Sequence, residues 1–172
     1  MERADGVGIA APQVGLAIRL LIVDGAPFGE DDPELAAFRR VMINPVLLEE
    51  SEETADYNEG CLSVPDIHAD ITRPARIKVK YLNEKGEEVT EELDGFKCRM
   101  VQHEMDHLIG KMFVDRATPI RKKMIAGKFC LAAVAVFMIA MSAMGDGHGE
   151  FGQVARGVLS RFAGEDVASR FC

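Results

Sequence analysis

The feature that most constrains this sequence is the pentapeptide HEMDH, which spans His103 to His107. Residues four positions apart lie on the same face of an α-helix, so both imidazoles can reach one metal ion if the segment is helical. Glu104 lies beside them and can accept a proton from water activated by that ion. The chain has only four histidines, and two of them fall at this spacing. The pentapeptide therefore predicts a metal site on a helix, in preference to a polar helix face with two chance histidines.

The pattern around this pentapeptide predicts an α+β fold. Apolar runs and alternating segments predict strands at 18–24, 41–49, 75–82 and 87–93, with a hairpin turn at 83–86. The strand at 41–49 contains Pro45, so we expect it at a sheet edge or irregular. Helices are expected at 34–40, 95–109 and 119–127, the second of them ended by Gly110. Most strands precede the main helix, which is the order of an α+β protein and not of alternating βαβ units.

Composition limits the classes of partner. The chain has 172 residues, of which 48% are hydrophobic, enough for one domain with a sizeable core. Its net charge of -8 argues against direct binding to nucleic acid or to an anionic membrane, because like charges repel. The four cysteines show no paired short spacing, and no secretory signal precedes them, so we expect a reducing, cytoplasmic setting. They are Cys61, Cys98, Cys130 and Cys172.

A catalytic site of this kind needs a third protein ligand and an open fourth position. The candidates are Cys61, His68, Cys98, His148 and several carboxylates. Cys61 follows Gly60, which lets the backbone approach closely, and a thiolate suits Zn²⁺ or Fe²⁺. Alone, however, such a cysteine is more often a small core residue. Cys98 lies five residues before His103 and points off the ligand face, so we expect it in the core. On these grounds the third ligand stays open.

Three segments of the chain, taken together, resemble a known family. They match in order the three sequence motifs of the peptide deformylases: GVGIAAPQ at Gly6–Gln13, EGCLS at Glu59–Ser63 and QHEMDH at Gln102–His107. The resemblance extends from about Gly6 to about Lys128. It implies a fold of mixed and antiparallel β-sheets around a central HExxH helix. It also implies an enzyme that hydrolyses the N-formyl group of formyl-methionyl nascent peptides and releases formate.

The resemblance implies a role for each matching residue. Cys61, His103 and His107 would bind the metal, with water in the fourth position, and Glu104 would act as general base and then as general acid. The oxyanion would be stabilised by the Gln13 side chain and the Leu62 backbone N–H. The residues implied to surround the substrate are Val7, Gly8, Gly60 and Met100, of which Met100 would line the pocket for the methionine side chain. A supporting ion pair is implied between Glu59 and Arg73.

The same resemblance implies a cofactor and partners. The expected cofactor is Fe²⁺, with Zn²⁺ or another divalent metal able to replace it. The expected partners are formyl-methionyl nascent polypeptides, with transient contact to a ribosome near the exit of the nascent chain. Both expectations come from the family.

The chain differs from the family at both ends. Family members carry a helix and strands before the first motif, whereas this chain starts almost at that motif. We therefore expect a catalytic domain over 1–128 without the usual N-terminal part, followed by an apolar and helical tail over 129–172. Residues 129–144 are almost wholly apolar, which suits a buried helix or appended sequence. Membrane insertion through 129–144 is less favoured, because a spanning helix needs about 17–25 residues.

Two other functions fit parts of the sequence. The first is an HExxH metallopeptidase with Glu150 or His148 as third ligand, although such an enzyme has no need of the EGCLS segment. The second is a truncated, inactive metal-binding remnant that acts as a decoy or interaction protein.

Overall fold

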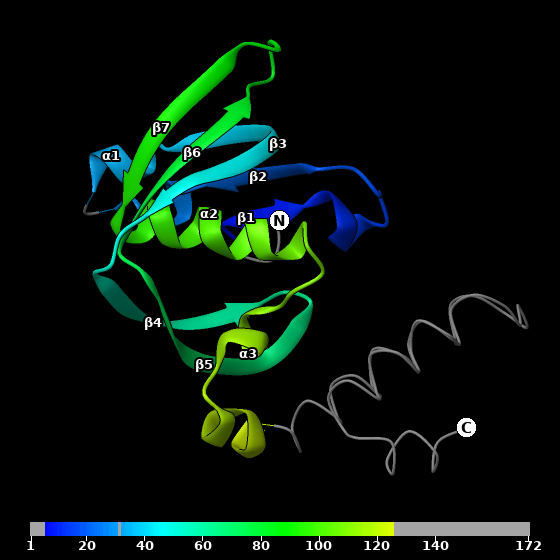
Figure 1. Ribbon diagram of the computed structural model, residues 1–172, viewed down its shortest axis with the longest axis vertical. Helices are drawn as coiled ribbons and strands as arrows, with labels where there is room; N and C mark the ends of the chain where they lie inside the picture. Colours follow the sequence, from blue (N-terminus) through cyan, green and yellow to red (C-terminus); the bar gives the residue numbers. More distant parts are fainter. Residues whose placement is uncertain (1–5, 31, 126–172) are drawn as a thin grey trace, which may run out of the picture. The chain divides into compact units, whose positions relative to one another are not determined.

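The computed structural model describes residues 6–30 and 32–125 (Figure 1). These residues fall into two compact units. The larger unit lies within Met1–Ser63 and Ala69–Ala117, and it contains the predicted site. The described residues of the smaller unit are Val64–His68 and the segment from Thr118.

The strands of the described residues form two sheets, of which the five-stranded one is antiparallel throughout. A five-stranded sheet has the order β1-β2-β3-β6-β7, and β4 pairs with β5. The sheet strands are β1 (Gly8–Ala10), β2 (Leu20–Asp24), β3 (Arg39–Glu50), β6 (Arg76–Leu82) and β7 (Glu88–Asp94), and the separate pair is β4 (Thr54–Cys61) and β5 (Val64–Pro74). The helices are α1 (Pro33–Ala36), α2 (Gly95–His107) and α3 (Phe113–Arg116), with 3-10 helices at Ala11–Val14 and Ala26–Phe28.

The core lies between the five-stranded sheet and α2, which runs along that sheet in Figure 1. Strand β6 shows why: its buried residues alternate with more exposed ones, as the sequence ARIKVKYL requires for a strand with one buried face. The buried residues of β6 pack with the apolar side of α2, which presents Cys98, Met100 and Val101. The sheet thereby fixes the orientation of the helix that carries HEMDH.

The predicted fold class and its main elements are confirmed. The four predicted strands are β2, β3, β6 and β7, and the predicted central helix is α2. Gly110 follows α2 with a left-handed φ of 68°, and its N–H donates to the His107 carbonyl, so it ends the helix as expected. The smaller helix predicted at 119–127 is helical over residues 119–125, the part that is described.

Strand β3 and α1 bear on two further expectations. Strand β3 is irregular, which is the second of the two forms expected for it, and it is not an edge strand, because it pairs with β2 on one side and β6 on the other. Its register with β6 shifts between Ile43 and Val46, and Pro45 lies in that irregularity, where no ladder hydrogen bond is lost. The helix predicted at 34–40 ends at Ala36, because Arg39 and Arg40 pair with β2 instead.

Strands β4 and β5 were not predicted from periodicity. In β4 the buried position is occupied by a charged residue, Glu59, so no apolar alternation marks the strand. In β5 the alternation is present at residues 67–72, between Pro65 and Pro74, and the prediction missed it. The predicted tail over 129–172, including the apolar stretch 129–144, lies outside the described residues. Within 6–30 and 32–125, no helix is both long and apolar enough to cross a membrane.

Candidate metal centre

The structure brings together the two histidines of HEMDH and Cys61. The ligand atoms of Cys61, His103 and His107 all lie within 4.8 Å of one another, and Cys61 Sγ is 3.4 Å from His107 Nε2. His103 and His107 stand one turn apart on α2, with their ring centroids 5.1 Å apart. One thiolate and two imidazoles form a donor set that suits Zn²⁺ or Fe²⁺. The residues therefore fit a divalent metal ion.

Cys61 reaches the histidines from a separate element, because it is the last residue of β4. Burial raises the pKa of its thiol, but hydrogen bonds with His103 and His107 outweigh burial and lower the pKa to about 5. The Ser63 backbone lowers it further. A thiolate at neutral pH is the form of cysteine that binds metal ions.

A buried ion network supports His103 from the side away from the thiolate. Glu59 Oε2 is 3.0 Å from His103 Nδ1, so the other ring nitrogen, Nε2, is left to face Cys61. Burial raises the pKa of Glu59, but hydrogen bonds from Arg73 and His103 outweigh it and lower the pKa well below its usual range. Arg73 donates to both oxygens of Glu59, at 2.8 and 2.9 Å, which gives the expected ion pair. Glu59 thus orients His103 as a carboxylate.

Arg73 continues the network to the C-terminal part of α2. Its Nη1 donates to Asp106 Oδ2 at 2.6 Å, and Arg116 of α3 donates to both oxygens of the same carboxylate. Asp106 is 2% exposed and Arg73 also 2%, so these charges are buried as well as paired. The charged side chains on α2 and β5 can be buried here because each of them has a charged partner.

Glu104 lies beside the two histidines with an unpartnered oxygen. The residue is 5% exposed, and in the described part of the chain its Oε2 is buried without a hydrogen-bond partner. Burial raises the pKa of Glu104 to about 7, against the lowering effect of the charges on His103 and His107. Gly8 of β1 packs directly on this carboxyl group, since a Cβ at position 8 would overlap Glu104 Oε1. The glycine is thus needed for close approach of β1 to the carboxylate.

Gln13 extends the site from the opposite side, after β1. Its Oε1 accepts from the Ala10 backbone N–H at 2.8 Å, which fixes the amide plane and turns Nε2 outward. Nε2 donates to Ser63 Oγ at 3.0 Å and lies 3.8 Å from Cys61 Sγ. A neutral donor therefore lies next to the thiolate and the Leu62 backbone.

The remaining predicted residues lie close in the chain to these groups or in the core. Gly8 begins the edge strand β1 and Val7 immediately precedes it. Gly60 precedes Cys61 in β4, and Leu62 follows Cys61 with an exposed side chain. Met100 is 3% exposed and belongs to the core cluster. Cys98 is buried, as expected of a core residue, and Gln102 donates to its sulfur.

This geometry reduces the number of candidates for the third metal ligand. Within the described residues, Cys61, His103 and His107 form the one group with metal-binding spacing. His68 is exposed and belongs to the smaller unit. His148 and Glu150, the ligands that a metallopeptidase would need, lie outside the described residues.

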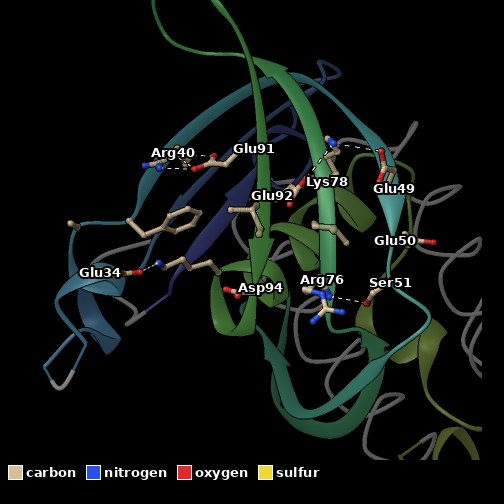
Figure 2. Close-up of a pocket in the computed structure, with 15 residues that line it drawn as sticks. Glu34, Arg40, Glu49, Glu50, Ser51, Arg76, Lys78, Glu91, Glu92 and Asp94 are labelled. Atoms are coloured by element: carbon tan, nitrogen blue, oxygen red, sulfur yellow. Dashed lines mark hydrogen bonds and ion pairs between the residues drawn. The ribbon is translucent and has the colours of Figure 1, made fainter.

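A pocket of about 760 Å³ occurs elsewhere, over β3, β6, β7 and α1 (Figure 2). None of the predicted site residues line it. Several of its charged side chains pair with one another, as Figure 2 shows for Arg40 with Glu91 and for Lys78 with Glu49. Lys97 pairs with Glu34. The pocket is therefore polar, yet its cations are already neutralised.

Comparison with known proteins identifies the family of this chain. The family profile of polypeptide deformylases matches residues 1–123. This chain belongs to the peptide deformylase family. It is 44% identical over 128 residues to the peptide deformylase of Cytophaga hutchinsonii, an alignment that covers 74% of this chain and 68% of that protein.

Solved deformylase structures show the same fold. The enzyme from Thermotoga maritima is 46% identical, with a TM-score of 0.61 over 69% of this chain and 74% of that one. Peptide deformylase 1B from Arabidopsis thaliana is 30% identical, with a TM-score of 0.69 over 86% of this chain and 77% of that one. The deformylase assignment made from the motifs is thereby confirmed.

Several residues around this deformylase site were not found from the sequence. Arg99, Asp106 and Arg116 all bind charged partners next to the metal ligands. The sequence contains only one signal for them: charged residues stand next to apolar residues in helical segments. Their partners lie far away in the sequence, so no spacing rule identifies the pairs.

Proposed function

We propose that this deformylase removes the formyl group from formyl-methionyl nascent peptides through a metal ion held by Cys61, His103 and His107. The observation that carries the proposal is the convergence of these three donors beside the buried carboxylate of Glu104, whose Oε2 has no hydrogen-bond partner among the described residues. The resident ion is Fe²⁺, and Zn²⁺ or another divalent metal can replace it, in keeping with the mixed sulfur and nitrogen donors. When bound, the ion supplies Lewis-acid chemistry, polarising the formyl oxygen and acidifying water.

Glu104 carries the proton through the reaction. Its carboxylate accepts a proton from the attacking water and later gives that proton to the leaving amine, so one group acts as base and then acid. Two features support this role. The pKa of Glu104 is raised to about 7, and its Oε2 has no hydrogen-bond partner among the described residues. A carboxyl group with a pKa near the working pH can perform both transfers.

Gln13 and Leu62 stabilise the negative charge that develops on the formyl oxygen. The Gln13 amide is fixed through Ala10, so its Nε2 is oriented before substrate binds, and the Leu62 backbone N–H supplies a second donor. Donors that are oriented in advance need no reorganisation in the transition state. Val7 and Gly8 offer backbone groups to an extended substrate along the edge strand β1.

Specificity comes from an apolar pocket for the methionine side chain, formed by Val7 and Met100, and from crowding at the formyl carbon next to Gly60. Loss of buried methylenes costs about 0.8 kcal/mol each, so replacing the substrate methionine by alanine lowers kcat/KM by more than about tenfold. Norleucine should be close to methionine because it keeps an unbranched apolar chain. An acetyl group places a methyl where formyl carries hydrogen, so acetyl-Met peptides are cleaved very slowly.

The test is formate release by the protein loaded anaerobically with Fe²⁺. Formyl-Met-Ala-Ser and acetyl-Met-Ala-Ser are compared under identical metal loading, with Cys61→Ser as the control that removes one ligand. Release of formate from the formyl peptide, with little acetate from the acetyl peptide, supports the proposal. Equal rates for the two peptides, or none from either, would contradict it.

The domain, partners and location follow from the same proposal. Residues 1–128 form the catalytic domain, and nascent formyl-methionyl chains reach it during transient contact with a ribosome. The net charge of -8 supports contact through the nascent chain and not through nucleic acid. A cytoplasmic location suits both this substrate and the free thiols of Cys61 and Cys98.

A further inference from the structure

The metal ligands come from two separate elements, and their spacing therefore depends on how those elements are joined. His103 and His107 share the rigid helix α2, whereas Cys61 ends β4. Glu59 lies two residues before Cys61 on β4, and most of the groups that hold β4 near α2 converge on it. The contacts between α2 and the β4–β5 strand pair thus decide where the thiolate lies.

Arg99 makes the largest set of these contacts. It lies one turn before His103 on α2 and is 4% exposed. Its Nη1 donates to Glu59 Oε1 at 2.6 Å and to the Ile71 carbonyl at 3.1 Å, and its Nη2 donates to the Ala55 carbonyl at 2.6 Å. Its guanidinium also lies over the Tyr57 ring, 4.8 Å from the centroid. One side chain of α2 therefore contacts both strands of the pair and the carboxylate that orients His103.

We propose that Arg99 is a positioning residue that sets the place of Cys61 relative to His103 and His107. The guanidinium is planar and its donors have fixed directions, so three acceptors on β4 and β5 can be satisfied only at one separation of these strands from α2. Arg73 cannot replace this function. It is itself part of β5, and it contacts α2 at the Asp106 carboxylate and, at 3.5 Å, at the Gln102 carbonyl. Among the described residues, its side chain donates no hydrogen bond to the Ala55 end of β4. The proposal rests on the metal site of the proposed function.

Arg40 provides a matched control. It also binds a carboxylate, with three short contacts to Glu91, and it also lies over an aromatic ring, that of Phe38 at 4.7 Å. It differs in being more exposed, at 35% of its side chain against 4% for Arg99, and in its place, on β3 and away from the metal ligands. Arg40→Met therefore removes the same kind of interactions without touching the strands that carry Cys61.

The experiment measures metal binding in Arg99→Met, Arg99→Lys, Arg40→Met and Cys61→Ser. Zn²⁺ affinity is determined by competition with a chelator, and the visible and near-ultraviolet spectrum of the Co²⁺ form reports thiolate coordination and geometry. Loss of a group that orients metal ligands typically weakens affinity by about 10–100-fold, and we expect this for Arg99→Met. Arg99→Lys should show a smaller loss of Zn²⁺ affinity, since lysine keeps the charge but not the fixed, planar set of donors. Arg40→Met should match the parent protein.

If Arg99 had only a structural role, its substitution would lower the thermal stability of the metal-free protein. The Zn²⁺ affinity and the Co²⁺ spectrum would then stay unchanged. Parent-like Zn²⁺ affinity in folded Arg99→Met therefore overturns the proposal. If Arg99→Met does not fold, parent-like affinity in Arg99→Lys overturns it. Equal Zn²⁺ binding by Cys61→Ser and the parent also overturns it, because the ligand set would be wrong. A different outcome is a protein that binds Zn²⁺ through Cys61 and yet releases no formate. That result contradicts the proposed function alone, and the Zn²⁺ affinities of the Arg99 variants still decide the role of Arg99.

Discussion

Glu104 is the residue on which the chemistry depends most directly. The side chain is buried, and within residues 6–30 and 32–125 its Oε2 has no hydrogen-bond partner, which costs stability because a buried carboxyl group without a partner is unfavourable. The cost is expected at a position selected for reactivity instead of stability. The histidines on either side of it and Gly8 against it leave little freedom for the side chain.

Glu104→Gln keeps the size of this side chain and removes the proton acceptor. We expect normal Zn²⁺ content and a fall in kcat of about 10²–10⁴-fold, because general base catalysis contributes on that order. Metal content is measured by atomic absorption and turnover by formate release. Near-native turnover would show that another group accepts the proton.

Gly8→Ala tests the close approach of β1 to the same carboxylate. The added Cβ overlaps Glu104 Oε1, so the carboxyl group must move. A displacement of about 1 Å near the reacting atoms can cost about 10²-fold in rate, and we expect a loss of that order with metal content retained.

A double-variant comparison separates this effect from damage to the fold. If Gly8 acts through Glu104, Gly8→Ala adds no further loss to Glu104→Gln. Fully additive losses would instead indicate that Gly8 acts on substrate binding or on the strand itself.

Among the elements, α2 has two functional sides. One side packs apolar residues against the five-stranded sheet, and the other buries charged residues that pair with β4, β5 and α3. The helix itself was predictable, because its ligands and its end at Gly110 are local features of the sequence. The charged inward positions of β4 and β5 were not, because Glu59 and Arg73 are buried through their pairing with each other and with charged groups on α2.

The buried ion pairs of α2 predict a dependence of stability on pH. Burial raises the pKa of Asp106, but the hydrogen bond from Arg116 and the charge of Arg73 outweigh it, so the pKa is lowered in the folded protein. A lowered pKa stabilises the folded state above the unfolded pKa of about 3.9, and this contribution is lost as pH falls through the folded pKa. Stability should therefore fall on acidification below a pH of about 4.

Asp106→Asn tests this origin. The variant should be less stable than the parent near neutral pH, because Arg73 and Arg116 lose a charged partner, and should lose less on acidification. Urea unfolding with a chelator present, near pH 7 and again at about pH 3, measures both effects. If the parent and the variant lose the same free energy of unfolding on acidification, other carboxylates cause the acid sensitivity.

For the whole molecule, the metal links two elements that the chain connects only distantly. A ligand that binds the folded state alone stabilises it by about 2.7 kcal/mol at a hundred times its Kd. Removal of the metal should therefore lower Tm, by roughly 5–10 °C for a domain of this size. Calorimetry with and without a chelator measures the shift. Cys61→Ser should show little shift, and an equal shift in that variant would contradict the ligand assignment.

The separation of Cys61 from His107 by 46 positions also has a consequence for the order of events in folding. Two histidines on a nascent helical turn form only half of the site, and the thiolate joins them after β4 has docked on α2. Contacts between segments so far apart in the chain form more slowly than local helical ones, so the site should be complete only late in folding. Metal uptake should therefore mark the last step by which a newly made chain becomes an enzyme, and chains that stall earlier would compete poorly for the ion.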